Sequence, residues 1–273
     1  MNNESINDVT ISVIMGTYNG RYRIAKAVES IIEQTFNNWE LLICDDCSTD
    51  DTLHFLLEKY SDNAKIKILH LQKNSGLAAA LNECLKHAKG KYIARMDDDD
   101  YSHPNRFEKQ LKFIDSHPGF KIFGTSINYM DDDGIYGCDV FEEKEVSKNR
   151  VFKGNCFVHP TIIMERQALL SVGGYTDSLE TLRGEDYDLW CKLYSKGYKG
   201  INSSEILFDY YENKNSIKRR KFKYDYLLFR NKLKWRRRLN LPFYFIIYAY
   251  RCLLVASIPQ PIYVFLRRIK VKS

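Results

Sequence analysis

In Lys91-Tyr92-Ile93-Ala94-Arg95-Met96-Asp97-Asp98-Asp99-Asp100, an apolar run passes directly into four consecutive acids. The aromatic and β-branched residues of the run are typical of a strand. Four neighbouring carboxylates repel one another and are costly to hold at a strand end. Two interpretations remain, a solvated surface loop or a group that binds a divalent cation. Because the acids directly follow a buried-looking strand, we favour the cation.

The spacing of the acids suits a hard cation. Mg²⁺ binds one or two carboxylates together with the phosphates of a substrate. With a spacing of two, Asp97 and Asp99 can point toward one ligand. Asp98 and Asp100 have the same spacing, so the sequence leaves the choice of pair open.

Strands and helices alternate along the chain before this motif. Strands are expected over residues 9–15, 39–44, 66–70 and 91–96, with helices over 24–32, 52–60 and 76–88. This alternation predicts an α/β fold with a mostly parallel sheet flanked by helices. Ligands bind such sheets at the carboxyl ends of the strands. The polar clusters at 16–20, 45–51 and 97–100 all fall at those ends, which predicts a site there.

The pattern changes after residue 104. We expect a helix over 106–117, strands over 121–124 and 160–164, a charged irregular segment over 131–150, and a helix from 184 to 196.

The first two polar clusters suit a nucleotide. Thr17, Tyr18 and Asn19 offer backbone amides and an aromatic face, although a plain turn is the alternative. The cluster lacks the glycine spacing of a dinucleotide fingerprint and the Gly-Lys-Ser/Thr of a P-loop, which disfavours both classes. In the second cluster, capping of the next helix by Ser48, Thr49 or Asp50 leaves Asp46 free to accept from the ring N–H of uracil.

Glu185 and Asp186 stand at an expected helix start. One acid there is the ordinary stabilising arrangement. Three acids within the four residues 185–188 exceed what a helix start requires, so one of them can serve as a general base.

Six motifs in order resemble glycosyltransferase family 2, the inverting GT-A enzymes, over about residues 9–195. They are Ser12-Val13-Ile14-Met15-Gly16-Thr17-Tyr18-Asn19, Leu42-Ile43-Cys44-Asp45-Asp46-Cys47-Ser48-Thr49-Asp50, Asn74-Ser75-Gly76-Leu77, Tyr92 to Asp100, His159-Pro160-Thr161, and Glu185-Asp186-Tyr187-Asp188-Leu189-Trp190.

The resemblance implies a role for each motif. Thr17, Tyr18, Asn19 and Asn74 line the pocket of a nucleotide-sugar donor, expected to be a UDP-sugar, and Asp46 binds the base. Asp97 and Asp99 form the D-x-D motif, with Asp99 on Mn²⁺ or Mg²⁺ beside the diphosphate. Asp186 is the general base that deprotonates a glycan or lipid-linked acceptor in surface polysaccharide synthesis. Relatives often carry Arg and His near the end of this domain, but residues 210–216 contain neither.

Charge divides the chain into an acidic body and a basic tail. Residues 218–273 hold 16 Lys and Arg and one acid, whereas the rest holds 25 bases and 34 acids. We expect a GT-A catalytic domain over 1–215 and a basic, aromatic, helical segment over 216–273. The mostly apolar residues 239–258, flanked by Arg236–Arg238 and by bases at 267–270, suit a helix in the headgroup region of an anionic membrane. Alternatively this segment packs on the catalytic domain, or forms a contact in an oligomer.

Two other readings of the sequence are less favoured. A nucleic-acid-binding module fits the basic tail, but the acidic body argues against a broad phosphate footprint, so no nucleic acid is expected. A Mg²⁺-dependent phosphatase uses Asp-x-Asp after its first strand, whereas these acids follow the fourth. His159 can be a metal or acceptor ligand, or a structural residue.

Cysteine usage and the N-terminus indicate the compartment. The chain has seven Cys, an odd number, and its first ten residues are polar. Both features favour a reducing cytoplasm over secretion. With the basic tail, they predict a peripheral enzyme on the cytoplasmic face of the cell membrane. Cys44 and Cys47 form a C-x-x-C without a second pair, so a zinc site is disfavoured.

Overall fold

The fold is described from a computed structural model for residues 9–212, 222–258 and 262. Its strands are β1 (Ile11–Thr17), β2 (Trp39–Asp45), β3 (Ile66–His70), β4 (Tyr92–Arg95), β5 (Tyr101–Ser102), β6 (Ile122–Asp131), β7 (Gly134–Asp139), β8 (Ile163–Glu165) and β9 (Gly200–Tyr211). Its helices are α1 (Ile24–Ile32), α2 (Thr52–Tyr60), α3 (Leu77–His87), α4 (Arg106–Ser116), α5 (Lys148–Lys153), α6 (Arg166–Ser171), α7 (Glu185–Ser195), α8 (Phe222–Arg238) and α9 (Ile246–Ala256). Short 3₁₀ helices are η1 (His159–Thr161), η2 (Leu179–Thr181) and η4 (Phe243–Phe245).

The described strands form one mixed sheet in the order β3-β2-β1-β4-β8-β6-β9-β5, with β7 paired to β6. Strands β1 to β4 run parallel, which confirms the alternation predicted from the sequence. Strand β8 then pairs antiparallel with both β4 and β6. The carboxyl ends of β1, β2 and β4 therefore meet at one edge of the sheet.

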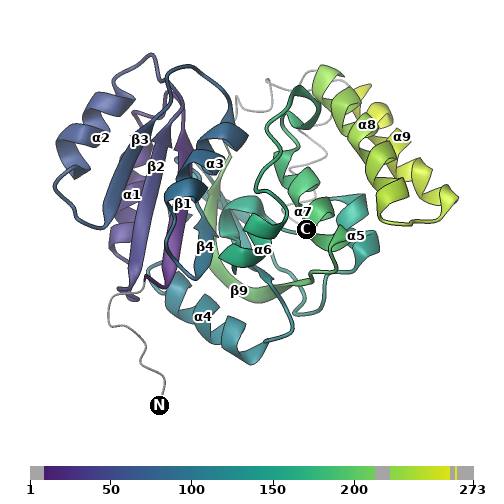
Figure 1. Ribbon diagram of the computed structural model, residues 1–273, viewed down its shortest axis with the longest axis horizontal. Coiled ribbons are helices and arrows are strands. Elements are labelled where there is room, and N and C mark those ends of the chain that lie inside the picture. Colours follow the sequence, from purple (N-terminus) through teal and green to yellow (C-terminus); the bar gives the residue numbers. More distant parts are fainter. Residues whose placement is uncertain (1–8, 213–221, 259–261, 263–273) are drawn as a thin grey trace.

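Helices cover both faces of the parallel half (Figure 1). On one face, Ile11, Val13 and Met15 of β1 pack in a core that includes residues of α1, α2 and α4. On the other, Ile14 belongs to a core formed with α3, α6 and α7. Burial on both faces explains why these strands read as nearly continuous apolar runs.

One expectation for the second half of the chain is wrong, and the bounds of another are shifted. The segment 131–150 was expected to be irregular, but it contains β7, which forms a hairpin with β6, and the start of α5. Gly134 at the turn has φ 114°, a conformation that favours glycine. The strand expected over 160–164 begins only at Ile163, because Pro160 lies in η1 and has no N–H to give to a ladder.

The C-terminal helices α8 and α9 lie side by side against α7 and α5 (Figure 1). Trp235, Leu239 and Phe245 are buried in the same core as Leu189 of α7. The indole Nε1 of Trp235 donates a hydrogen bond of 2.7 Å to Asp188. Packing on the catalytic domain, the alternative weighed for this tail, is therefore what α8 does.

Several expectations lie outside the described residues. These are the polar N-terminal residues 1–8, the domain boundary at 215–216 and the basic cluster at 267–270. Within the described ranges, every helix is too short or too polar to cross a membrane.

The docking of α8 predicts a stability difference. Trp235→Ala should lower the free energy of unfolding by about 3–5 kcal/mol, because it opens a cavity in the core and removes the donor to Asp188 Oδ1. Tyr244→Ala removes an aromatic ring that is 69% exposed on the same hairpin. That control should change stability by less than about 0.5 kcal/mol in urea unfolding. Equal, small losses in both variants would show that α8 is not docked in solution.

Candidate active site

The loop after β4 turns its four acids in different directions. Thr17 at the end of β1 donates a hydrogen bond of 2.5 Å to Asp98. A Cβ on Gly20 would lie 2.5 Å from the same carboxylate oxygen, so this close approach needs glycine. Asp98 is thus occupied by the neighbouring strand.

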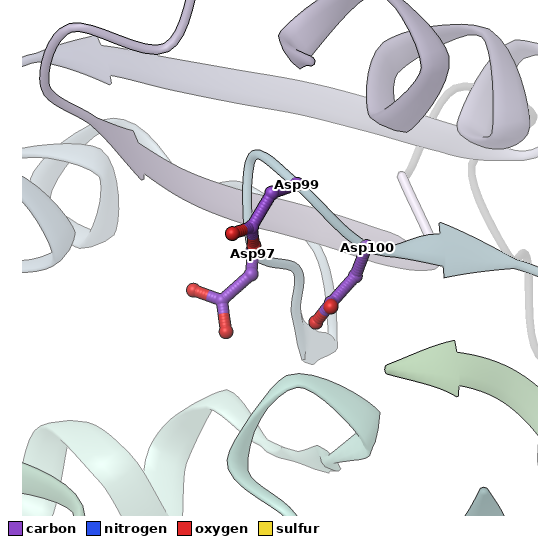
Figure 2. Close-up of side chains that lie close together, drawn as sticks. All are labelled: Asp97, Asp99 and Asp100. Carbon is purple, nitrogen blue, oxygen red and sulfur yellow. The ribbon is translucent and has the colours of Figure 1, made fainter. Parts of the chain in front are cut away.

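The other three acids of the loop come together. One carboxylate oxygen from each of Asp97, Asp99 and Asp100 lies within 4.8 Å of the others (Figure 2). Within the described part of the chain this is the group suited to a metal ion. The structure therefore places the predicted pair Asp97 and Asp99 together, and adds Asp100, which the sequence analysis did not assign.

Asp100 is the most buried of the three. Its side chain is 0% exposed, and its Oδ1 accepts from the backbone N–H of Tyr211 over 2.7 Å. Its Oδ2 is buried without a hydrogen-bond partner among the described residues. A solvated loop, the alternative reading of this acidic run, does not fit such burial. An orphaned buried oxygen beside two further carboxylates does fit a hard divalent cation, which prefers oxygen ligands.

Burial and mutual repulsion change the acidity of this loop. Burial, together with the charges of Asp97 and Asp98, raises the pKa of Asp99 to about 7. Burial also raises the pKa of Asp98 to about 6, against the opposing hydrogen bond from Thr17. Arg95, buried at the end of β4, forms an ion pair with Asp97 and offsets part of the negative charge. The sequence analysis missed this arginine, since an isolated Arg within an apolar run carries no distinguishing signal.

These pKa values predict how the metal-free protein responds to pH. A carboxyl whose folded pKa lies above its unfolded value stabilises the fold at low pH, and that stability is lost as pH rises through the folded pKa. In chelator, we expect Asp99→Asn to match wild type near pH 4 and to exceed its unfolding free energy increasingly toward pH 8. Urea unfolding of the pair at several pH values measures this difference. If the difference in unfolding free energy between Asp99→Asn and wild type stayed constant with pH, the raised pKa of Asp99 would not be its cause.

The first and second polar clusters are joined by Asn19. Its side-chain Oδ1 accepts from the backbone N–H of Thr49 over 2.8 Å, and its own N–H donates to Ser48 Oγ over 2.9 Å. Asn19 adopts φ 55°, a left-handed conformation that Asn tolerates. Thr17 is buried, whereas Tyr18 is 47% exposed and presents its ring to solvent at this edge.

The sequence analysis expected Asp46 to be free, but its carboxylate has hydrogen-bond partners in the structure. Its two oxygens accept from the backbone N–H groups of Ser75 and Gly76, each over 2.7 Å. Asn74 donates to the Asp46 carbonyl over 3.3 Å. The loop before α3 is therefore fixed to the end of β2, which places Asn74 and Asp46 at one edge. A carboxylate has further lone pairs, so a contact to a base remains geometrically open.

Asp186 lies in the first turn of α7, where its Oδ1 accepts from the N–H of Tyr187 over 2.7 Å. Burial raises the pKa of Asp186, and the charges of Arg95 and Asp97 act on it in opposite directions. Burial and the adjacent Asp186 raise the pKa of Glu185 to about 7. The loop after β4 thus lies within electrostatic reach of the start of α7.

His159 has a partner in the protein. Its Nε2 lies 2.8 Å from the hydroxyl of Tyr175, and its ring packs edge-on against Trp190. Burial holds the pKa of His159 well below its usual range, so the ring is neutral. Among the described residues it is not part of the metal-suited group, which favours the structural reading of this residue.

Comparisons with known proteins identify the family and the fold of this chain. The sequence model of the family described as Glycosyl transferase family 2 matches residues 12–170. EpsE of Bacillus subtilis (strain 168) is 38% identical over 255 residues, which cover 92% of this chain and 91% of EpsE. The Escherichia coli enzyme WfgD, named UDP-Glc:alpha-D-GlcNAc-diphosphoundecaprenol beta-1,3-glucosyltransferase, is 33% identical over 220 residues, 80% of this chain and 83% of its own. The crystal structure of residues 1–349 of S. aureus TarS in complex with UDP has a TM-score of 0.67 at 22% identity, covering 89% of this chain and 69% of that one.

The fold is that of a GT-A glycosyltransferase. The chain belongs to glycosyltransferase family 2. The resemblance found in the sequence motifs is thereby confirmed for the family, the fold and the enzyme class.

Proposed function

We propose that this enzyme transfers a sugar from a nucleotide diphosphate donor, a UDP-sugar, to a hydroxyl of a lipid-linked glycan in surface polysaccharide synthesis. The observation that carries the proposal is the convergence of Asp97, Asp99 and Asp100 at the edge of the sheet, within electrostatic reach of Asp186. The names of two similar proteins support the substrates. WfgD is named for UDP-Glc and a diphosphoundecaprenol acceptor, and TarS was crystallised with UDP.

The acidic cluster is assigned to a divalent cation, Mn²⁺ or Mg²⁺, held by Asp97 and Asp99 with Asp100. When bound, such a cation neutralises the negative charge of a departing diphosphate. Arg95 holds Asp97 in place through their ion pair. Thr17 holds Asp98 away from the cluster.

The donor is assigned to the loops at the ends of β1 and β2. Tyr18 offers an exposed ring for a base to stack on, and Asn19 fixes the two loops together. Asp46 and Asn74 are placed at the same edge, where we assign them to the nucleotide.

Asp186 is assigned as the general base. Its raised pKa makes it a stronger acceptor for the proton of an acceptor hydroxyl. The deprotonated oxygen then attacks the anomeric carbon from the face opposite the leaving nucleoside diphosphate. The carbon–oxygen bond to the diphosphate breaks as the new glycosidic bond forms, so the linkage is inverted.

Donor hydrolysis tests the proposal. Purified full-length protein should slowly release nucleoside diphosphate from one nucleotide sugar in a panel, with Mn²⁺ or Mg²⁺ present. Release of phosphate from phosphomonoesters, without any nucleoside diphosphate, would support the phosphatase reading instead.

We also propose that the enzyme is peripheral on the cytoplasmic face of the membrane, bound through the η4–α9 surface. This surface comprises the exposed apolar side chains Phe243, Tyr244, Ile247, Tyr250 and Leu254. Arg237 and Arg238 at the end of α8 are exposed nearby in the chain. Apolar side chains with adjacent bases suit insertion into an anionic headgroup layer.

Vesicle sedimentation measures this association. Phe243→Ser/Ile247→Ser should weaken binding to phosphatidylglycerol vesicles at least tenfold, since a fully buried apolar side chain contributes about 1.5–3 kcal/mol. Ile135→Ser/Val140→Ser, at comparably exposed positions on or just after β7, should leave binding unchanged. Wild-type protein that stays in the supernatant at low salt would rule out the membrane role.

A further inference from the structure

A hollow lies between η2 and α8. Its volume is about 210 Å³, and it is lined by Glu180, Leu227, Arg230, Asn231 and Lys234. None of these residues belongs to the donor site or the acidic cluster described above.

The hollow is rich in hydrogen-bond donors. Arg230 and Lys234 are four residues apart on α8, a spacing that places both side chains on one face of the helix. Asn231 is only 5% exposed, and its amide nitrogen has no hydrogen-bond partner among the described residues. Glu180 supplies one opposing charge, so cations outnumber acids two to one. A buried amide donor without a partner, beside two cations, calls for an anionic acceptor.

The position of the hollow connects it to the proposed base. Leu228 of α8 lies 3.7 Å from the point where a Cβ on Gly184 would be, and Gly184 directly precedes Glu185 and Asp186. The backbone N–H of Gly184 donates to the carbonyl of Thr181 in η2 over 2.8 Å. The hollow therefore adjoins the loop that leads into Asp186.

The same helical hairpin carries the η4–α9 surface. Helix α8 lines the hollow, and α9 packs against α8 (Figure 1). The side chains of Ile247 and Leu254 on α9 are exposed. A lipid-linked acceptor has its phosphate between its sugar and its lipid. Its sugar would lie at Asp186 while its lipid lies toward the membrane, so its phosphate would lie beside α8.

We propose that this hollow binds the phosphate group of the lipid-linked acceptor. The inference rests on the proposed function, because it takes Asp186 as the acceptor-side base. Arg230 pairs with phosphate oxygens through its planar guanidinium, Lys234 adds a point charge, and the amide of Asn231 donates a further hydrogen bond.

Farnesyl diphosphate, a soluble lipid diphosphate, is the probe. Its binding to the full-length protein is measured by equilibrium dialysis in excess chelator, so that no cation recruits the diphosphate to the acidic cluster. Arg230→Gln/Lys234→Gln should weaken binding at least tenfold. The control Lys148→Gln/Lys196→Gln also removes two positive charges, but from exposed positions outside the hollow. It should leave farnesyl diphosphate binding unchanged. Farnesol, which lacks phosphate, should bind all three proteins equally.

Two further measurements identify the source of the phosphate that the hollow binds. Inorganic pyrophosphate should compete with farnesyl diphosphate for wild type. Phosphatidylglycerol vesicles should bind the wild type and Arg230→Gln/Lys234→Gln within twofold, because a headgroup of the bulk membrane is not the ligand. The assignment would be overturned if the two double variants lost farnesyl diphosphate binding equally, or if the wild type did not bind it. A tenfold loss of vesicle binding by Arg230→Gln/Lys234→Gln would also overturn it. Donor hydrolysis by wild type is measured separately, so failure of the proposed function is distinguished from failure of this site.

Discussion

Asp186→Asn should reduce sugar transfer by about 10²–10⁴-fold, the usual contribution of a general base. Asparagine preserves the shape of the side chain and its hydrogen bond from Tyr187 N–H, but it does not take up a proton. Donor affinity should survive, since Asp186 is placed on the acceptor side. Steady-state transfer rates and nucleotide-sugar binding by calorimetry measure the two effects.

Glu185→Gln is the matched control for this substitution. Glu185 stands in the same first turn of α7, and its pKa is raised to about 7. We expect Glu185→Gln to retain far more activity than Asp186→Asn. If Glu185→Gln lost as much turnover, with Asp186→Asn active, the base would be Glu185. If donor affinity in Asp186→Asn fell as far as turnover, Asp186 would belong to the donor site.

The edge of the sheet could be predicted from the sequence because it depends on local patterns. Apolar runs that end in polar clusters predicted the strands β1, β2 and β4. These strands are parallel, and parallel strands have their carboxyl ends at the same edge of a sheet. Thr17, Asp46 and Asp97 were therefore expected to share an edge, and they do. The alternation of strand and helix carries this information without any knowledge of side-chain packing.

The direction of each acid could not be predicted, because distant partners decide it. Asp100 accepts from Tyr211 N–H, 111 residues away on β9. That strand was not expected at all, since its first half contains Asn202, Ser203, Ser204 and Glu205 and hides the apolar alternation. Two of these polar residues, Asn202 and Ser203, are nevertheless buried.

The place of the C-terminal helices was likewise open in the sequence. Lys232 reads as one more base of a solvated or membrane-binding helix, because lysine is rarely buried. In the structure it is 3% exposed and donates to the carbonyl of Phe152 over 2.7 Å. One face of α8 thus belongs to the enzyme core, and most of the exposed large apolar residues of the described C-terminal helices lie on η4 and α9.

Asp99→Asn should nearly abolish transfer, by about 10³-fold or more, because a bound cation contributes several kcal/mol to neutralising a departing diphosphate. Excess chelator should have the same effect on wild type, reversed by Mn²⁺ or Mg²⁺. The variant should at the same time be more stable than metal-free wild type near pH 8, since the substitution removes one of three crowded carboxylates. If Asp99→Asn instead caused a folding defect, the variant would lose stability as well as activity. Full transfer activity of wild type in excess chelator would remove the cation from the mechanism. It would leave the repulsion among Asp97, Asp99 and Asp100 to be offset by side chains of the protein, chiefly by Arg95 through its ion pair with Asp97.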